Sequence, residues 1–269
     1  MGTKREIDVK IALGIAYDGA FFCGWQSQPS RCGVQDVLES ALAAIAQHEV
    51  RVHAAGRTDT GVHALAQVVH FETLTSRPLT AWVRGVNAHL PAGVRVNWAC
   101  AVADDFHARF SAHSRSYQYL LYNAPVASAV MANKSGWFHL PLDYEAMQTA
   151  IQYLEGEHDF SAFRAAECQA KSPVRTITKA TVQSVGHYFI FSFTANAFLQ
   201  HQVRNMIGAL VYVGKGSYAP DYIQTLLQAR DRTISPPTFS PHGLYLTGVG
   251  YDQKFALPDS NEQALQILI

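Results

Sequence analysis

Apolar positions in the first hundred residues recur with the two periods that distinguish strands from helices. Short apolar runs and alternation predict strands at KIALGIAYDG, VRVHAAG, AQVVHFE and VRVNWACAVA. Residues 33–47 instead carry apolar side chains at helical spacing, namely Val34, Val37, Leu38, Ala41, Leu42 and Ile45. A second, shorter helix is predicted between Pro78 and Pro91. Strands and helices therefore alternate through this part of the chain.

The rest of the chain repeats this succession loosely. Strands are predicted at SRSYQYLLYN, TITKATVQSVG, HYFIFSFTANA and GLYLTGVGY, the middle two paired across a turn at Gly186 and His187. Helices are predicted over residues 142–156, in FLQHQVRNMIGALVYVGKG and in PDYIQTLLQARD. The segment from Ala124 to Leu140 has no period and is expected to form a loop, and the polar tail after Pro258 is expected to fray.

The order of these elements predicts an α+β fold built from two related halves that share one sheet. With 269 residues, the chain can form one large domain or two smaller ones. We place the N-terminal half at residues 1–109 and the C-terminal half at residues 110–269, joined near Arg109.

Composition and charge exclude few functions. Lys+Arg and Asp+Glu both number 21, so the net charge does not indicate a polyanionic partner, although a local basic face would not show in the sum. No run approaches the ~20 apolar residues of a membrane span, and the charged start MGTKREIDVK is unlike a targeting signal. A cytoplasmic protein without membrane contact is therefore expected.

The four cysteines are scattered, and none has a neighbour at metal-ligand spacing. Free thiols are expected, rather than a disulfide framework or a zinc site, for Cys23, Cys32, Cys100 and Cys168.

The run GRTDTGVHA, residues 56–64, places Arg57 two positions before Asp59 in a glycine-bounded bend between two predicted strands. An aspartate in a turn is usually a turn former, but this loop has more hydrogen-bonding groups than a turn needs. The tripeptide D-T-G is also typical of aspartic proteases, in which two carboxylates share a proton. No second D-T-G is present, and the adjacent Arg57 would favour ionisation of both carboxylates. The remaining interpretation is a single ionised carboxylate that acts as a nucleophile.

Such a carboxylate needs a nearby cation, and the predicted helix FLQHQVRNMIG offers Arg204 at the edge of its apolar stripe. Arg204 either extends along that stripe to water or turns inward onto the carboxylate, since buried charges are rarely unpaired. Tyr117, in SRSYQYLLYN, either packs in the core or stacks on a nucleobase. The side chains that could contact phosphates, or form a solvated face, are His107, Arg109, His113, Arg115, Lys171 and Arg175.

Taken together, these motifs resemble the tRNA pseudouridine synthases of the TruA type. GRTDTGVHA looks like the catalytic loop of that family. YDGAFFCGWQ, DDFHARFSAHSRSYQY, NAFLQHQVRNMIG and GLYLTGVGY are similar to its other blocks, in the family's order, from Tyr17 to Tyr251. The loop has Thr60 at a position where members of the family are also expected to carry a small residue such as alanine, and this is its departure from the family pattern.

The resemblance implies a continuous mixed, mostly antiparallel sheet flanked by helices, a pseudo-twofold axis and an active cleft between the halves. It implies an enzyme that isomerises uridine to pseudouridine on the 3′ side of the tRNA anticodon stem-loop, as a homodimer and without metal or organic cofactor. Asp59 would be the catalytic aspartate, and Arg57 would help to extrude the target nucleotide. Tyr117 would stack on the flipped uracil, Arg204 would pair with Asp59, and Leu244 would pack against the base. The alternatives are an RNA-binding module without chemistry and an aspartic hydrolase.

Overall fold

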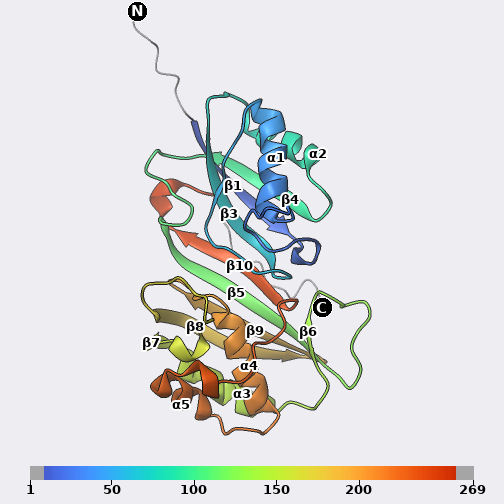
Figure 1. Ribbon diagram of the computed structural model, residues 1–269, viewed down its shortest axis with the longest axis vertical. Coiled ribbons are helices and arrows are strands. Elements are labelled where there is room, and N and C mark those ends of the chain that lie inside the picture. Colours follow the sequence, from blue (N-terminus) through green and yellow to red (C-terminus); the bar gives the residue numbers. More distant parts are fainter. Residues whose placement is uncertain (1–8, 259–269) are drawn as a thin grey trace, which may run out of the picture. The chain divides into compact units, whose positions relative to one another are not determined.

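The strands of the computed structural model, which describes residues 9–258, form a ten-stranded sheet (Figure 1). They are β1 (Val9–Tyr17), β2 (His53–Ala54), β3 (His63–Thr73), β4 (Val94–Ala101), β5 (Ala112–Asn123), β6 (Gly136–Phe138), β7 (Gly156–Asp159), β8 (Val174–Val185), β9 (Tyr188–Ala195) and β10 (Leu244–Tyr251). The order along the sheet is β4-β1-β3-β10-β5-β9-β8-β7, with β2 beside β3 and β6 beside β5. The pairs β1–β3, β1–β4, β5–β9 and β8–β9 are antiparallel, whereas β5 and β6 are parallel. The predicted α+β class with a mixed, mostly antiparallel sheet is confirmed.

The helices flank this sheet. They are α1 (Val34–Ala46), α2 (Val86–His89), α3 (Tyr144–Ile151), α4 (Gln202–Gly214) and α5 (Tyr222–Ala229). A π-helical turn, Ala81–Gly85, leads directly into α2. Among the described residues, no helix has the length and apolarity to cross a bilayer. The predictions for the first eight residues and for the tail after Pro258 lie outside the part of the chain that the structure describes.

Four predicted elements differ from the structure. The strand predicted at VRVHAAG shrinks to the two residues of β2. The expected loop 124–140 contains β6, which could not be predicted because a strand of three residues is too short to show a period. The helix predicted to Gly156 ends at Ile151, with a 3-10 turn after it, and the polar strand β7 follows. The helix predicted from Phe198 begins only at Gln202, because His201 has a φ of +62° and breaks the helical path.

The chain separates into two compact units, and each is built on its own core. The first contains residues 9–113 and 246–258, and the second contains Ser114–Tyr245. Our division after Arg109 gives a single boundary, whereas the structure has a second one within β10, which returns the C-terminal segment to the first unit.

In the first unit, α1 and α2 lie side by side on one face of β1, β3 and β4 (Figure 1). The predicted apolar face of α1 is buried at Val34, Leu38, Ala41 and Leu42. Burial of the valine and leucine side chains contributes about 1.5–3 kcal/mol each relative to exposure, which is the main source of stability for a helix of this length.

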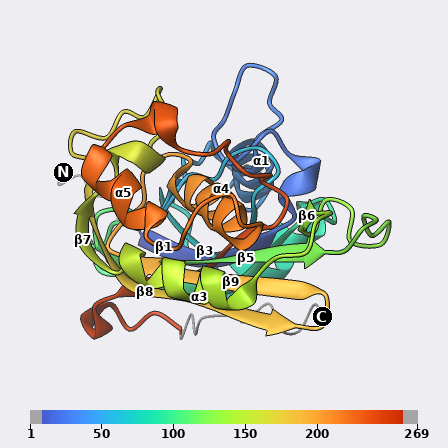
Figure 2. The same cartoon turned by 90° about the horizontal axis from the view of Figure 1, so that it is seen from below.

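In the second unit, β8 and β9 form the predicted hairpin around Gly186, with Val185 opposite Tyr188. The inward face is aromatic, with Phe191 and Phe193 of β9 fully buried. Figure 2 shows α4 and α5 on one face of these strands. Nearly all of α4 is buried, which makes it a rigid support for the side chains that it carries.

Cys23 and Cys32 form a disulfide, with Cα atoms 5.4 Å apart, and the expectation of four free thiols is therefore wrong for this pair. Residues 23 to 32 form a loop that returns to its start, where the Cys23 amide donates to the Cys32 carbonyl at 2.9 Å. That return could not be recognised from a separation of nine residues. Cys100 and Cys168 are free thiols.

Three histidines of the first unit, His53, His70 and His107, lie in contact. The rings of His53 and His70 are 5.1 Å apart and stacked, and His107 is 4.6 Å from His70. His70 is 3% exposed, and its Nδ1 accepts from the Ala108 amide at 3.1 Å. Burial, together with the charges of His107 and His53, lowers the pKa of His70 to about 3.

The disulfide should add measurable stability. Closing a loop of this size restricts the unfolded chain, which corresponds to about 2–3 kcal/mol in the free energy of unfolding. Urea unfolding with and without a dithiol reductant should show this difference. The variant Cys23→Ser should resemble the reduced protein and should not respond to reductant. Equal stability of the wild-type protein in both conditions would contradict the bridge.

His70 should make stability depend on acid pH. Its neutral form is favoured in the folded state, so its contribution is complete above the ordinary histidine pKa near 6.5. As the pH falls from about 6.5 towards 3, the unfolded chain takes up a proton that the folded protein does not, and stability decreases. In His70→Asn, the side-chain oxygen can still accept from Ala108, and urea unfolding should depend less on pH over this range. His89→Asn, at an exposed position, is the control.

Candidate active site

The acid loop, residues 56–62, connects β2 to β3 and carries Arg57 and Asp59. Its second half is a tight turn in which the Val62 amide donates to the Asp59 carbonyl at 3.1 Å. Gly61 has a φ of +80°, as the third position of a type II turn requires. Arg57 is exposed and Asp59 is half-buried. The turn thus places the carboxylate on a fixed backbone with access to solvent.

Side chains from β1 and β3 bind the first half of the acid loop. The Gln67 amide donates to the Gly56 carbonyl at 2.7 Å and accepts from the Gly56 amide at 3.4 Å. The hydroxyls of Tyr17 and Thr58 are 2.8 Å apart, and the Gln67 amide also donates to the Tyr17 oxygen at 3.4 Å. Burial raises the pKa of Tyr17 to about 12, so its phenol keeps its proton at neutral pH.

The segment around Gly24 supports the acid loop from another side. The Trp25 amide donates to the Thr58 carbonyl at 2.9 Å. A Cβ at Gly24 would lie 2.9 Å from that carbonyl oxygen and 3.1 Å from the Thr60 nitrogen, and Gly24 has a φ of +90°. Glycine is therefore required here for both reasons. The Cys23–Cys32 disulfide begins at the adjacent residue.

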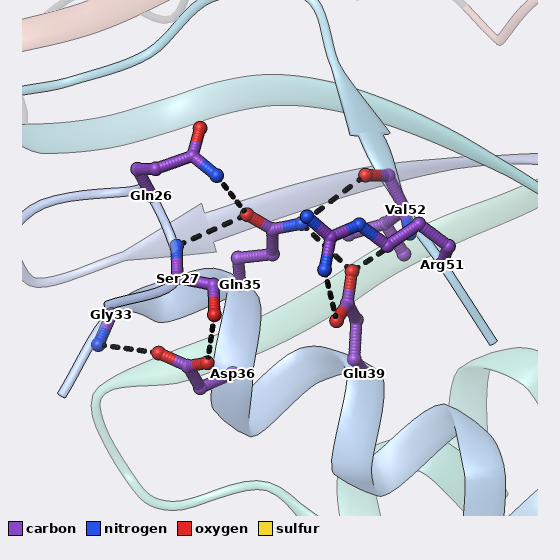
Figure 3. A network of polar contacts seen from close by, with 8 residues as sticks. All are labelled: Gln26, Ser27, Gly33, Gln35, Asp36, Glu39, Arg51 and Val52. Atoms are coloured by element: carbon purple, nitrogen blue, oxygen red, sulfur yellow. Dashed lines mark hydrogen bonds and ion pairs between the residues drawn. The ribbon is translucent and has the colours of Figure 1, made fainter. Parts of the chain in front are cut away.

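A network of polar side chains connects that segment to the start of β2 (Figure 3). The buried Gln35 of α1 accepts from the Gln26 side chain and the Ser27 amide, both at 3.1 Å, and donates to Glu39 at 2.8 Å. Glu39 in turn accepts from the Val52 amide at 3.0 Å. The helix thereby fixes the chain immediately before β2 and the acid loop.

The end of the motif is anchored by His63, which is 2% exposed. Its Nδ1 lies 3.0 Å from an Asp18 carboxylate oxygen and 3.1 Å from the Gly19 amide nitrogen. This nitrogen can donate to the carboxylate or accept from the amide, one at a time. Either bond ties the first residue of β3 to the turn that follows β1.

The other three predicted site residues lie in the second unit. Tyr117 of β5 is 9% exposed, with its ring edge-on to Phe198 at 5.2 Å. Arg204 is in the first turn of α4, and its Nε donates to the Phe239 carbonyl at 2.9 Å. Leu244 begins β10 and is buried. The Phe239 ring also lies 5.9 Å from Tyr119, so the residue that binds Arg204 is packed against β5.

The structure therefore places Arg57 and Asp59 on one loop of the first unit. It places Tyr117, Arg204 and Leu244 on β5, α4 and β10 within the second unit. The pairing of Asp59 with Arg204, and the stacking and packing roles of Tyr117 and Leu244, stay predictions. Among residues 9–258, no group of three or more His, Cys, Asp or Glu side chains could bind a metal ion.

Sequence reasoning missed the residues that support the acid loop. Tyr17 and Gln67 are polar positions within otherwise apolar strand segments, IAYDG and LAQVVHF, and this interruption was the available signal. Thr58 and His63 are among the hydrogen-bonding groups that the loop carries beyond what a turn needs, but the sequence did not indicate what they bind. Their partners Tyr17 and Gly19 lie 41 and 44 positions away in the chain, where no local pattern connects them.

Known proteins match this chain over nearly all of its length. It is 67% identical to tRNA pseudouridine synthase A of Methylobacillus flagellatus, over 96% of this chain and 99% of that protein. It is 57% identical to the protein of the same name from Nitrosomonas eutropha, over 94% of this chain and 91% of that protein. Among solved structures, the archaeal box H/ACA sRNP Nop10-Cbf5 complex matches at 12% identity over 88% of this chain and 48% of that chain, with a TM-score of 0.35, a likeness that adds nothing to the assignment.

The family model described as tRNA pseudouridine synthase matches residues 14–111 and 150–252. Those ranges include Arg57, Asp59, Arg204 and Leu244, whereas Tyr117 lies between them. The matched ranges cover most of the chain, and the relatives extend the likeness to 96% of its length. The chain belongs to the tRNA pseudouridine synthase family.

Proposed function

We propose that this protein converts uridine to pseudouridine in the anticodon stem-loop of tRNA, with Asp59 as the catalytic residue. The observation that carries the proposal is the half-buried Asp59 on a loop whose backbone is bound on several sides, in a chain that belongs to this family. A loop that only connected two strands would not need this support.

The reaction is an isomerisation and needs no co-reactant. The bond between the sugar C1′ and the base N1 breaks, the base rotates, and C1′ is joined to C5. The proton on C5 is lost and N1 gains one, so atoms and electrons balance. Asp59 can assist by attack on the substrate or by steering proton removal, since a carboxylate is competent for both.

A base within a helical stem is inaccessible, so the target uridine must first be flipped out at a cost of a few kcal/mol. Arg57 is exposed next to Asp59 and, in this proposal, occupies the space that the base leaves. Tyr117 stacks on the extruded uracil and Leu244 packs against it. Stacking on an aromatic ring offsets about 1–3 kcal/mol of the lost base stacking.

Arg204 is the proposed partner of the Asp59 carboxylate. Its Nε is already bonded to the Phe239 carbonyl, which limits the rotation of the side chain. A guanidinium fixed in this way can present its remaining N–H groups to a carboxylate with little further loss of entropy. The electrostatic attraction is strongest when the pair is shielded from water by bound RNA.

Replacing the catalytic carboxylate should abolish chemistry but not RNA binding. In Asp59→Asn, pseudouridine formation in unmodified tRNA transcripts should fall by about 10³-fold or more, measured by carbodiimide-dependent primer-extension stops. Binding of tRNA should change little, because phosphate contacts dominate affinity. Asp221→Asn, an exposed aspartate of the second unit, is the matched control.

Two outcomes would argue against this assignment. Substantial turnover by Asp59→Asn would remove the catalytic role of the carboxylate. Normal activity of Arg204→Ala would remove Arg204 from the pair, whereas we expect that variant to be nearly inactive and Arg204→Lys to recover only part of the rate.

We also infer that the protein acts as a homodimer in the cytoplasm. The dimer is the arrangement that the resemblance to the TruA family implies. Val126 and Val130, which are 75% and 89% exposed, are apolar side chains that contact with a second copy could cover.

The oligomeric state can be measured directly. Light scattering coupled to gel filtration should give twice the mass of the chain, which is 29.6 kDa. A monomer at micromolar concentration would contradict the dimer while leaving the catalytic proposal intact.

A further inference from the structure

Tyr17 and Gln67 are polar side chains buried among apolar ones. They are 5% and 0% exposed, and Ile15, which is opposite Gln67 in the β1–β3 pairing, is fully buried. Burial of a phenol and an amide costs free energy unless both are hydrogen-bonded. An aliphatic pair would fill this space without that cost, so the polarity of these two positions requires a reason.

Apart from the bond that joins them to each other, their hydrogen bonds lead to the acid loop. Gln67 binds both backbone groups of Gly56, and Tyr17 binds the hydroxyl of Thr58. These attachments lie on either side of Arg57, and Asp59 follows directly. Two strands of the core therefore hold the chain on both sides of Arg57, up to the residue before Asp59.

The three side chains also orient one another. The Gln67 amide has two hydrogens, one for the Gly56 carbonyl and one for the Tyr17 oxygen. Because Tyr17 accepts from Gln67, its own hydrogen is available for Thr58. Tyr17 keeps that hydrogen at neutral pH, and a satisfied buried network of this kind favours a single arrangement.

We propose that Tyr17 and Gln67 are positioning residues for the reaction, setting through Gly56 and Thr58 the directions in which Arg57 and Asp59 leave the acid loop. This inference rests on the proposed function. A displacement of about 1 Å at a reacting group can cost about 10²-fold in rate. Binding of tRNA should be much less sensitive, because it is distributed over many phosphate contacts.

The test removes one hydroxyl at a time. Tyr17→Phe and Thr58→Val should each lower the single-turnover rate of pseudouridine formation by about 10- to 100-fold. The dissociation constant for tRNA, measured by filter binding, should change by less than about threefold, since the phosphate contacts remain. Thr58→Ser keeps the hydroxyl and should retain most of the rate. The double variant should be no slower than the slower single one, because both remove the same bond.

Tyr251→Phe is the matched control. It removes a phenol–carbonyl hydrogen bond of 2.6 Å to Ala108 in the same unit, away from the acid loop. This variant should lose stability to urea as Tyr17→Phe does, but should react at the wild-type rate.

The outcomes separate the two proposals. A wild-type rate for Tyr17→Phe, or a rate that falls only with tRNA affinity or folded fraction, overturns the positioning role. Should Tyr17→Phe fail to fold, the comparison of Thr58→Val with Thr58→Ser decides, because both leave the strands unchanged. If the wild-type enzyme forms no pseudouridine, the proposed function fails and this inference fails with it, whereas an active wild type with an equally fast Tyr17→Phe overturns the positioning role alone.

Discussion

The hydrogen bonds that side chains of β1 and β3 make to the acid loop are the constraint on which the candidate site depends. A loop between two strands normally has several conformations, and a carboxylate on it samples several directions. Here Gln67 and Tyr17 bind residues 56 and 58, and the Asp59–Val62 turn closes the other end. Polar groups that would be costly in a core are stabilised because each has a partner in this loop. The acid loop is therefore held in place by side chains of the sheet to which it is connected.

Independent elements reinforce the same segment. The Gly24 region packs against Thr58 and Thr60, and the Cys23–Cys32 bridge restricts that region in turn. Gln35 of α1 binds the Ser27 amide, which follows the Gly24 region, and Glu39 of α1 binds the Val52 amide, which precedes β2. Several modest contacts that act on one short segment can make it rigid, because each removes a different freedom. Rigidity of this kind favours chemistry that depends on the orientation of a single carboxylate.

The second unit restricts its own candidate residues, Arg204 and Tyr117, in a different way. Arg204 lies on α4, nearly all of which is buried, and Tyr117 lies in the buried middle of β5. The Phe239 carbonyl accepts from the Arg204 side chain, and the Phe239 ring packs near Tyr119 of β5. Such side chains lose little entropy when a ligand binds, since their rotamers are already restricted. In the base flipping that we propose, unstacking must be offset by new contacts, for which preformed groups are an advantage.

Period and motif were sufficient to predict most strands, the helices α1, α4 and α5, and the residues Arg57, Asp59, Tyr117 and Arg204 as candidates, whereas Leu244 came only from the resemblance to the family. These features follow from local patterns, since an apolar face or a glycine-bounded turn can be recognised from residues that are close together in the sequence. Short elements such as β2, β6 and β7 were misjudged because their existence depends on the neighbouring strand rather than on their own residues.

What the sequence determined by itself was the alternation of elements, the family and the identity of the chemical groups. What only the tertiary structure decided was which distant residues support the acid loop: the Tyr17–Thr58–Gln67 network, the contact of Gly24, and the closure of Cys23 on Cys32. Each of these joins positions that have no regular spacing along the chain. Their meeting depends on how the loops return to the sheet, and that return is fixed by packing, not by any pattern in adjacent residues.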